Sequence, residues 1–385
     1  MPKPMGKRVF GLDLMRATAI SLVVFSHISW LLPFKSGLLV DLMSIAGVIG
    51  VEIFFVLSGF LIGRIIYKFF VSEDFHSGDI KYFWIRRWFR TIPNYFLGLM
   101  WNLIVLLALG FSIPDGIWKY VLFIQNFSSG IPVFFYESWT LSIEEFAYLI
   151  GPIIIYLFYL FRRNGNRSRQ FLYMVICIIL MCTVLRLIYN ANQEIRDMEY
   201  WNLNLKAVVI YRLDAVYYGA LAAYLSLVWP GFWKRSRFVL FFLGVCLFIV
   251  LNLLPVAQGI LIESYPAFWN VWYLPLNSVA IMLTLPLLSN WHASSNVMTR
   301  LITGLSLISY AIYVLHYSII MQVMRHVIPN EQFIGIDLLI YIVVYLTAVL
   351  LSSYLLYKVY EKPMTDLRDH PKIIDRFRLK RENNS

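Results

Sequence analysis

The chain has 385 residues, of which 60% are hydrophobic and only 14% are charged, and its formal net charge is +11. Soluble domains carry roughly 45–50% apolar and about 25% charged residues, so this composition excludes an ordinary soluble protein and predicts a polytopic membrane protein. The basic residues lie mainly beside apolar segments, which is typical of membrane topology signals. We therefore expect no nucleic-acid partner, despite the positive charge.

Ten segments are long and apolar enough to cross a bilayer. They lie near residues 9–32, 43–66, 93–111, 143–161, 170–190, 207–228, 238–255, 272–289, 303–323 and 337–359. The predicted fold is an all-α integral membrane bundle of about ten transmembrane helices. Residues 1–365 form this bundle, and residues 366–385 form a basic cytoplasmic tail. With the N-terminus inside, 25 of the 33 lysines and arginines fall on cytoplasmic stretches and five on outer loops, which predicts that both termini are cytoplasmic.

The first apolar segment carries three ionisable residues, Asp13, Arg16 and His27. A charged group at membrane depth is costly unless it is paired or hydrated, so these residues indicate a functional site. Arg16 and His27 are eleven residues apart, close to three helical turns, so both project from one face roughly 16 Å apart. Asp13 lies three residues before Arg16 and is expected to pair with it. Alternatively, this pair is structural and His27 bonds to a neighbouring helix.

This first segment also resembles a signal peptide in having a basic start and an apolar core. Asp13 and Arg16 interrupt that core, and no small-residue cleavage site follows. We therefore expect the segment to be retained as the first helix.

The second apolar segment contains small residues, among them Ser58 and Gly59, that permit close helix contacts. Glu52 is the exception in this segment. It is expected either to pair with Arg16, His27 or another intramembrane arginine, or to lie in water at the outer end of its helix.

Before the third segment, Arg86, Arg87 and Arg90 cluster with Trp84 and Trp88. A basic and aromatic cluster at the inner interface commonly binds anionic lipid. The same arginines are suited to hold the phosphates of a nucleotide-containing donor. The cluster by itself leaves both interpretations open.

An apolar stretch, 120–127, precedes the fourth segment and is too short to span a membrane. It is expected to be re-entrant or interfacial. It leads to Glu144 and Glu145 near the predicted start of the fourth span. A helix N-terminus favours a nearby carboxylate, which explains one of these residues as a cap but is a poorer explanation for both.

Polar residues recur in the later spans. Arg212 and Asp214 are expected to pair with each other or with the two carboxylates of the fourth span, whereas Arg186 has no predicted role. His316 lies mid-span among tyrosines and is expected to be hydrogen-bonded structure. The three cysteines lie in apolar spans without metal-ligand spacing, so they predict packing and no metal site.

Six motifs occur in order along nearly the whole chain. They are Arg16-x10-His27; Gly50-Val51 with Phe54 to Ile62; Arg86-Arg87-x-x-Arg90-x-Ile92-Pro93-x-Tyr95; Gln125-Asn126 with Trp139-x-Leu141-Ser142-x-Glu144-Glu145-Phe146; Tyr310-x-x-Tyr313-x-Leu315-His316; and Glu361-x-Pro363. Together they resemble the acyltransferase family 3 membrane proteins, the bacterial O-acyltransferases that modify cell-surface glycans.

The resemblance implies transfer of an acyl group, commonly acetyl from acetyl-coenzyme A, to a sugar hydroxyl. The implied acceptor is a lipid-linked or surface polysaccharide such as O-antigen or exopolysaccharide, and the implied location is the bacterial inner membrane. Acyl-coenzyme A is then a donor substrate, and no cofactor is expected to be bound permanently. The other partners expected are membrane lipids, and the motifs specify no oligomeric state.

The resemblance also assigns roles to residues. Arg86, Arg87 and Arg90 are expected to hold the nucleotide, and Arg16 to guide the pantetheine arm. His27 is expected to act as general base or as a transient acyl carrier, with a carboxylate on its second nitrogen. That carboxylate is Glu144 or Glu145. Supporting roles fall to Asp13, Ser58, Gly59, Trp139, Arg212, Asp214 and His316.

Two other classes of protein fit parts of the sequence. A transporter or flippase of a lipid-linked sugar or acyl compound would also have many spans and intramembrane charges, but we find no internal inverted repeat. A structural or sensory subunit would bind a glycan without turning it over. Chemical turnover separates the enzyme from both.

Overall fold

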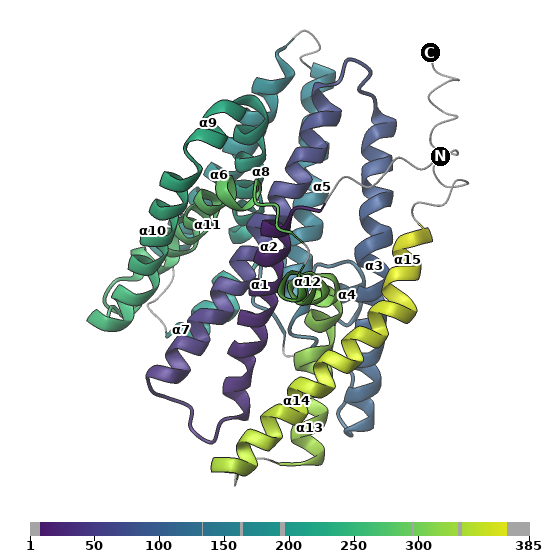
Figure 1. The fold of residues 1–385 in the computed structure, drawn as a ribbon, viewed down its shortest axis with the longest axis vertical. Coiled ribbons are helices and arrows are strands. Elements are labelled where there is room, and N and C mark those ends of the chain that lie inside the picture. Colours follow the sequence, from purple (N-terminus) through teal and green to yellow (C-terminus); the bar gives the residue numbers. More distant parts are fainter. Residues whose placement is uncertain are drawn as a thin grey trace. The chain divides into compact units, whose positions relative to one another are not determined.

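A computed structural model of the chain describes residues 8–132, 134–161, 165–192, 197–294, 296–329 and 333–367 (Figure 1). Within these ranges all regular structure is helical. The α-helices are α1 (Phe10–Ile28), α2 (Leu38–Val71), α3 (Ser77–Ala108), α4 (Trp118–Val121), α5 (Ser138–Phe161), α6 (Arg167–Asn192), α7 (Met198–Trp201), α8 (Val209–Val228), α9 (Pro230–Arg235), α10 (Arg237–Gln258), α11 (Leu274–Leu288), α12 (Val297–Leu315), α13 (Gln322–Val327), α14 (Gly335–Leu356) and α15 (Lys362–Leu367). Short 3-10 or π segments are η1 (Ser29–Leu31), η2 (Asn202–Lys206), η3 (Phe268–Tyr273), η4 (His316–Met321) and η5 (Tyr357–Glu361).

The predicted set of spans is confirmed. Among the described residues, nine helical stretches are long and apolar enough to cross a membrane. A tenth is formed by a bent pair, Met198–Lys206 with Val209–Val228, whose two parts meet at 72°. The chain is therefore an all-α protein with ten candidate transmembrane segments.

The third span begins earlier than the sequence predicted. α3 starts at Ser77 instead of residue 93, because His76 and Asp79 form a capping box at its N-terminus. Pro93, which we took as the start of the span, lies inside the helix and removes only one backbone donor there. The arginine and tryptophan cluster is consequently helical, and not part of a loop.

The fourth span also begins earlier, at Ser138 instead of residue 143. Glu144 and Glu145 therefore lie in the second turn of α5. Capping concerns the first turn of a helix, so the cap explanation for these carboxylates is wrong.

The chain divides into two compact units. The first comprises the described residues of 1–30, 34–64 and 175–309, and the second those of 31–33, 65–174 and 310–385. Apart from its first two residues, which end α15, the predicted tail 366–385 lies outside the described residues.

In the first unit, α2 and α8 pack at very short range. Gly59 and Gly219 permit this approach, since a Cβ on Gly59 would collide with the carbonyl oxygen of Val216 and a Cβ on Gly219 with that of Val56. A buried apolar cluster surrounds the crossing, with Val56 and Phe60 against two alanines of α8 and residues of α11. The crossing fixes the level at which the polar residues of α2 and α8 meet.

In the second unit, the predicted short apolar segment packs against α3 and α5. The Tyr95 hydroxyl donates to the carbonyl of Tyr120 at 2.7 Å, and the Tyr120 hydroxyl donates to the carbonyl of Phe134 at 2.7 Å. Gly98 lets Phe135 and Val314 approach the backbone of α3. Irregular backbone is tolerated at such a place because protein covers it.

Candidate functional site

α1 holds the predicted reacting histidine by a bond inside its own last turn. Nδ1 of His27 lies 2.9 Å from the carbonyl oxygen of Val23. A carbonyl only accepts, so Nδ1 is the protonated nitrogen and Nε2 carries the lone pair of the neutral ring. The backbone thus fixes the tautomer, a task that we expected of Glu144 or Glu145.

Asp13 does not pair with Arg16. Its carboxylate accepts two N–H groups of Arg8, at 3.0 and 2.6 Å. Arg8 precedes the helix, and its planar guanidinium group reaches the first turn, where it can bind both oxygens of a carboxylate. Ser306 of α12 links the two residues instead, because its hydroxyl donates to Asp13 at 2.9 Å and accepts from Arg16 at 3.5 Å.

The intramembrane charges of the first unit form two buried ion pairs. Glu52 of α2 pairs with Arg212 of α8, and it also accepts from the Ser278 hydroxyl at 2.9 Å. Asp214 pairs with Arg186 of α6 at 2.8 Å. All four charged side chains are at most 1% exposed.

These pairs decide between the predicted partners. Glu52 binds another intramembrane arginine, which was one of its expected alternatives. The expected pairing of Arg212 with Asp214 is wrong: residues two apart on a helix project about 200° apart and cannot face each other, and each binds a residue of another helix. Their pairing with the two carboxylates of the fourth span stays a prediction. Arg186 gains the structural role that the sequence did not predict.

Two predicted supporting residues, Ser58 and Gly59, lie on α2. Gly59 forms the contact with α8 described above, and Ser58 is half-buried next to it. Gly59 therefore belongs to the packing of the first unit, and the supporting role of Ser58 stays a prediction.

In the second unit, α3 and α5 bring the two predicted carboxylates into a polar interior. Glu145 accepts the hydroxyl of Thr91 at 2.7 Å, and Glu144 accepts the hydroxyl of Tyr148 at 2.8 Å. Glu144 and Glu145 belong to one compact unit and His27 to the other. Their pairing with His27 stays a prediction.

The three predicted donor-binding arginines differ in environment. Arg87 stacks on Tyr148, with its guanidinium carbon 4.4 Å from the ring centre, and its charge acts on Glu145. Arg86 donates to the Tyr82 hydroxyl at 2.9 Å and is half-buried, whereas Arg90 is exposed. Arg86 and Arg87 are thus partly buried, and Arg90 is the most exposed of the three.

The segment before α5 contributes buried amides. Gln125 donates to the hydroxyls of Ser138 and Ser142 at 3.1 and 2.7 Å, and Asn126 donates to the carbonyl of Trp139 at 3.1 Å. Trp139 is itself 5% exposed. The motif residues around Trp139 therefore form buried hydrogen bonds that hold the segment before α5 against that helix.

Glu137, which the sequence analysis did not single out, is buried just before α5. It accepts the backbone N–H of Ser318 at 2.7 Å and also binds the Ser318 hydroxyl. Burial raises the pKa of Glu137 to about 7. Ser318 lies in η4, the π segment that begins at His316, and Nδ1 of His316 is held by the carbonyls of Ile312 and Tyr313 at 3.0 and 2.9 Å.

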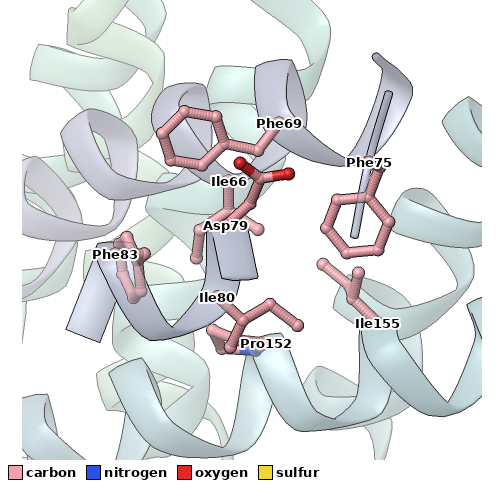
Figure 2. Close-up of a pocket in the computed structure, with 8 residues that line it drawn as sticks. All are labelled: Ile66, Phe69, Phe75, Asp79, Ile80, Phe83, Pro152 and Ile155. Atoms are coloured by element: carbon pink, nitrogen blue, oxygen red, sulfur yellow. The ribbon is translucent and has the colours of Figure 1, made fainter. Parts of the chain in front are cut away.

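Two of the cavities in the described part of the chain lie away from these residues. One of about 290 Å³ is lined by apolar side chains of α1, α2, α10 and α11 in the first unit. Its α1 residues, Leu14, Met15 and Thr18, lie on the side of the helix opposite Arg16 and His27. Figure 2 shows the other, of only about 10 Å³, where phenylalanines surround the carboxylate of Asp79. Neither cavity is the predicted site.

Metal ligands do not cluster in the described part of the chain, where no group of three or more His, Cys, Asp or Glu residues is placed to hold an ion. The first unit instead contains a histidine whose Nδ1 is bonded to the backbone, and the second unit contains three arginines and two partly buried carboxylates. These groups are suited to proton transfer and to binding an anionic substrate.

The fold and these residues define a multi-pass helical membrane protein with polar sites inside its bundle. The chain belongs to acyltransferase family 3, whose sequence profile, described as an acyltransferase domain, matches residues 9–358. The resemblance found in the sequence is thereby confirmed. No solved structure matches the chain.

Several curated proteins are similar to it. The peptidoglycan O-acetyltransferase OatA of Listeria monocytogenes is 30% identical over 176 residues, which cover 41% of this chain and 26% of that protein. The putative peptidoglycan O-acetyltransferase YrhL of Bacillus subtilis is 27% identical over 191 residues, covering 46% and 28%. The O-acetyltransferase OatA of Staphylococcus aureus is 26% identical over 396 aligned positions, covering 92% and 57%. The matched regions thus span between about a quarter and three fifths of these relatives.

Proposed function

We propose that this protein is a membrane O-acyltransferase that transfers an acyl group to a sugar hydroxyl of a lipid-linked or cell-envelope glycan. The observation that supports this most strongly is the family match over residues 9–358. The donor we propose is acetyl-coenzyme A. Peptidoglycan is the first acceptor to test, because two of the relatives are named for it; O-antigen and exopolysaccharide are the alternatives.

In the proposed reaction, Nε2 of His27 takes the proton of the acceptor hydroxyl while the oxygen attacks the thioester carbonyl. The acyl–sulfur bond then breaks, the acyl–oxygen bond is complete, and the proton passes from the imidazolium to the thiolate of coenzyme A. The hydrogen bond from Nδ1 to Val23 supports this role, since it presents Nε2 as the basic nitrogen. As an acyl carrier, the same Nε2 would attack the thioester first.

The remaining site residues have proposed roles in binding and support. Arg86 and Arg90 meet the phosphates of the donor, Arg87 follows them inward, and Arg16 guides the arm toward His27. Glu144 or Glu145 stabilises the charged form of the site during proton transfer. The distribution of lysine and arginine supports a cytoplasmic location of both termini, and the membrane that we propose is a bacterial inner membrane.

The test is release of coenzyme A thiol from acetyl-coenzyme A by the detergent-purified chain, with and without peptidoglycan fragments. Wild type should release thiol faster when acceptor is present, and His27→Ala should show no such acceptor-dependent release. His292→Ala is the matched control, because that histidine is exposed and lies in a loop. Turnover by His27→Ala equal to that of wild type would overturn the proposed role.

A transport function is the second candidate, and the 72° bend in the sixth span favours it. Broken helices are typical of binding sites in transporters. Movement of a labelled lipid-linked saccharide across proteoliposomes, without thiol release, is the result that this candidate predicts.

A further inference from the structure

One buried amide in the second unit lacks the hydrogen bonds that its neighbours make. Asn94 of α3 is 2% exposed, and neither Nδ2 nor Oδ1 has a hydrogen-bond partner among the described residues. On the same helix, Asn102 donates to the carbonyl of Gly98 at 2.9 Å. Buried polar groups are nearly always paired, so an amide with both its donor and its acceptor unpaired requires an explanation.

The position of Asn94 on α3 indicates what it faces. Residues 87, 91, 94 and 98 recur every three or four positions and so share one face of the helix. Thr91 on this face binds Glu145, and Arg87 on this face has a buried Nε without a hydrogen-bond partner. Arg87 and Asn94 are seven residues apart, which is roughly 10 Å along the helix.

Near Arg87, this face of the helix has a positive and a negative group close together. The positive charge of Arg87 acts on Glu145, whereas Arg86 donates to the Tyr82 hydroxyl and Arg90 is exposed. Phosphates therefore fit better beside Arg86 and Arg90, and a neutral part of a ligand fits better deeper on the face. Neighbouring side chains close around this level, since the Tyr310 hydroxyl donates to the carbonyl of Thr91 at 3.0 Å.

We propose that Asn94 binds a secondary amide of a substrate, and that this amide belongs to the pantetheine arm of the acyl-coenzyme A donor. Nδ2 would donate to the carbonyl of this amide. Because the C=O and N–H of a trans amide point to opposite sides, Oδ1 would accept from the N–H of the second amide of the arm, and both unpaired atoms are then satisfied. The donor source is favoured over an N-acetyl group of the acceptor because Asn94 lies on the same helix as the three arginines, inward of them. This inference rests on the proposed function.

Binding measurements on the detergent-purified full chain test it, with coenzyme A and adenosine 3′,5′-bisphosphate as probes. The second probe carries the same adenosine with its 3′-phosphate and the inner 5′-phosphate, but no amide. Asn94→Leu should weaken binding of coenzyme A about tenfold, the effect of losing one or two hydrogen bonds, and leave the bisphosphate unchanged. Asn102→Leu, a buried control on the same helix, should change neither affinity.

Measurements of turnover and of thermal stability distinguish binding of the pantetheine arm by Asn94 from a purely structural role of that side chain. Asn94→Leu should raise KM for acetyl-coenzyme A about tenfold with kcat retained, and it should unfold at the same temperature as wild type or higher, because it removes an unpaired buried amide. An unchanged coenzyme A affinity would overturn the inference and leave a bridging water as the partner. A rise in acceptor KM alone would overturn the donor assignment in favour of an N-acetyl group.

These results are distinguishable from failure of the proposed function. If wild type binds coenzyme A and turns over, an unaffected Asn94→Leu refutes only the amide contact. If wild type neither binds coenzyme A nor releases thiol, the proposed function and the inference both fail.

Discussion

Removing one partner of the Glu52–Arg212 pair should destabilise the protein strongly. Arg212→Met leaves the carboxylate of Glu52 buried, with the Ser278 hydroxyl at 2.9 Å as its remaining partner. Both members of the pair are at most 1% exposed, so water cannot replace the lost charge. Breaking a buried pair in this way costs about 3–5 kcal/mol, or roughly two to three and a half powers of ten in the unfolding equilibrium.

The double variant Glu52→Leu/Arg212→Met is the decisive comparison. Because both charges are gone, it should recover most of the loss, since apolar replacement of a buried pair is often neutral or stabilising by about 1–4 kcal/mol. Lys362→Met, which removes an exposed pair with Asp366, should change stability by less than about 1 kcal/mol.

Thermal unfolding of the purified proteins in one detergent, followed by tryptophan fluorescence and by recovery of monodisperse protein, measures these differences. The order of stability should be wild type close to the double variant, and both well above Arg212→Met. A double variant as unstable as Arg212→Met would refute the reasoning, because it would show that packing around Arg212 matters and the uncompensated charge does not.

Three further predictions concern single positions. Gly59→Leu should prevent close packing of α2 on α8, because its Cβ meets the carbonyl of Val216, and should abolish recovery of folded protein in size-exclusion chromatography, whereas Gly231→Leu, in open space, should not. For Glu137, burial raises the pKa to about 7 from 4.5, so the folded state holds a proton that the unfolded state has lost. The associated stability, up to about 3 kcal/mol, is present below pH 4.5 and is lost as the pH rises through about 7. Melting temperatures measured across this range should therefore fall with pH in wild type and depend less on pH in Glu137→Gln. An equal dependence on pH in the two proteins would contradict the assignment. Thr91→Val should lose its bond to Glu145 and lower stability by about 1–3 kcal/mol in denaturant titrations, while Thr91→Ser should retain it.

The features of this protein that the sequence predicts correctly are those whose signal is local. Each span is a continuous apolar run, so the ten segments can be read without knowing which helices are neighbours. Their ends were less well predicted, because Pro93 is tolerated inside α3 and the capping box begins at His76, seventeen residues before the predicted start of that span. Motifs that are contiguous in the chain likewise identified the family.

Partner choice was the part that the sequence left open or decided wrongly. Arg212 and Asp214 are near neighbours in the chain, yet each pairs with a residue of another helix, because their side chains project to different sides of α8. Asp13 pairs with Arg8 and not with Arg16, since an arginine outside the helix could offer two donors. Proximity along the chain was a poor guide to proximity in space.

By itself, then, the sequence determined the class of protein, its ten spans and its family, because apolar length and contiguous motifs are properties of the chain alone. The tertiary structure decided which charges are paired, which nitrogen of His27 carries the proton, and which buried amide on α3 lacks a partner. These features depend on residues brought together from distant parts of the chain, or on hydrogen bonds that can be assigned only when the helix boundaries and the packing of the helices are known.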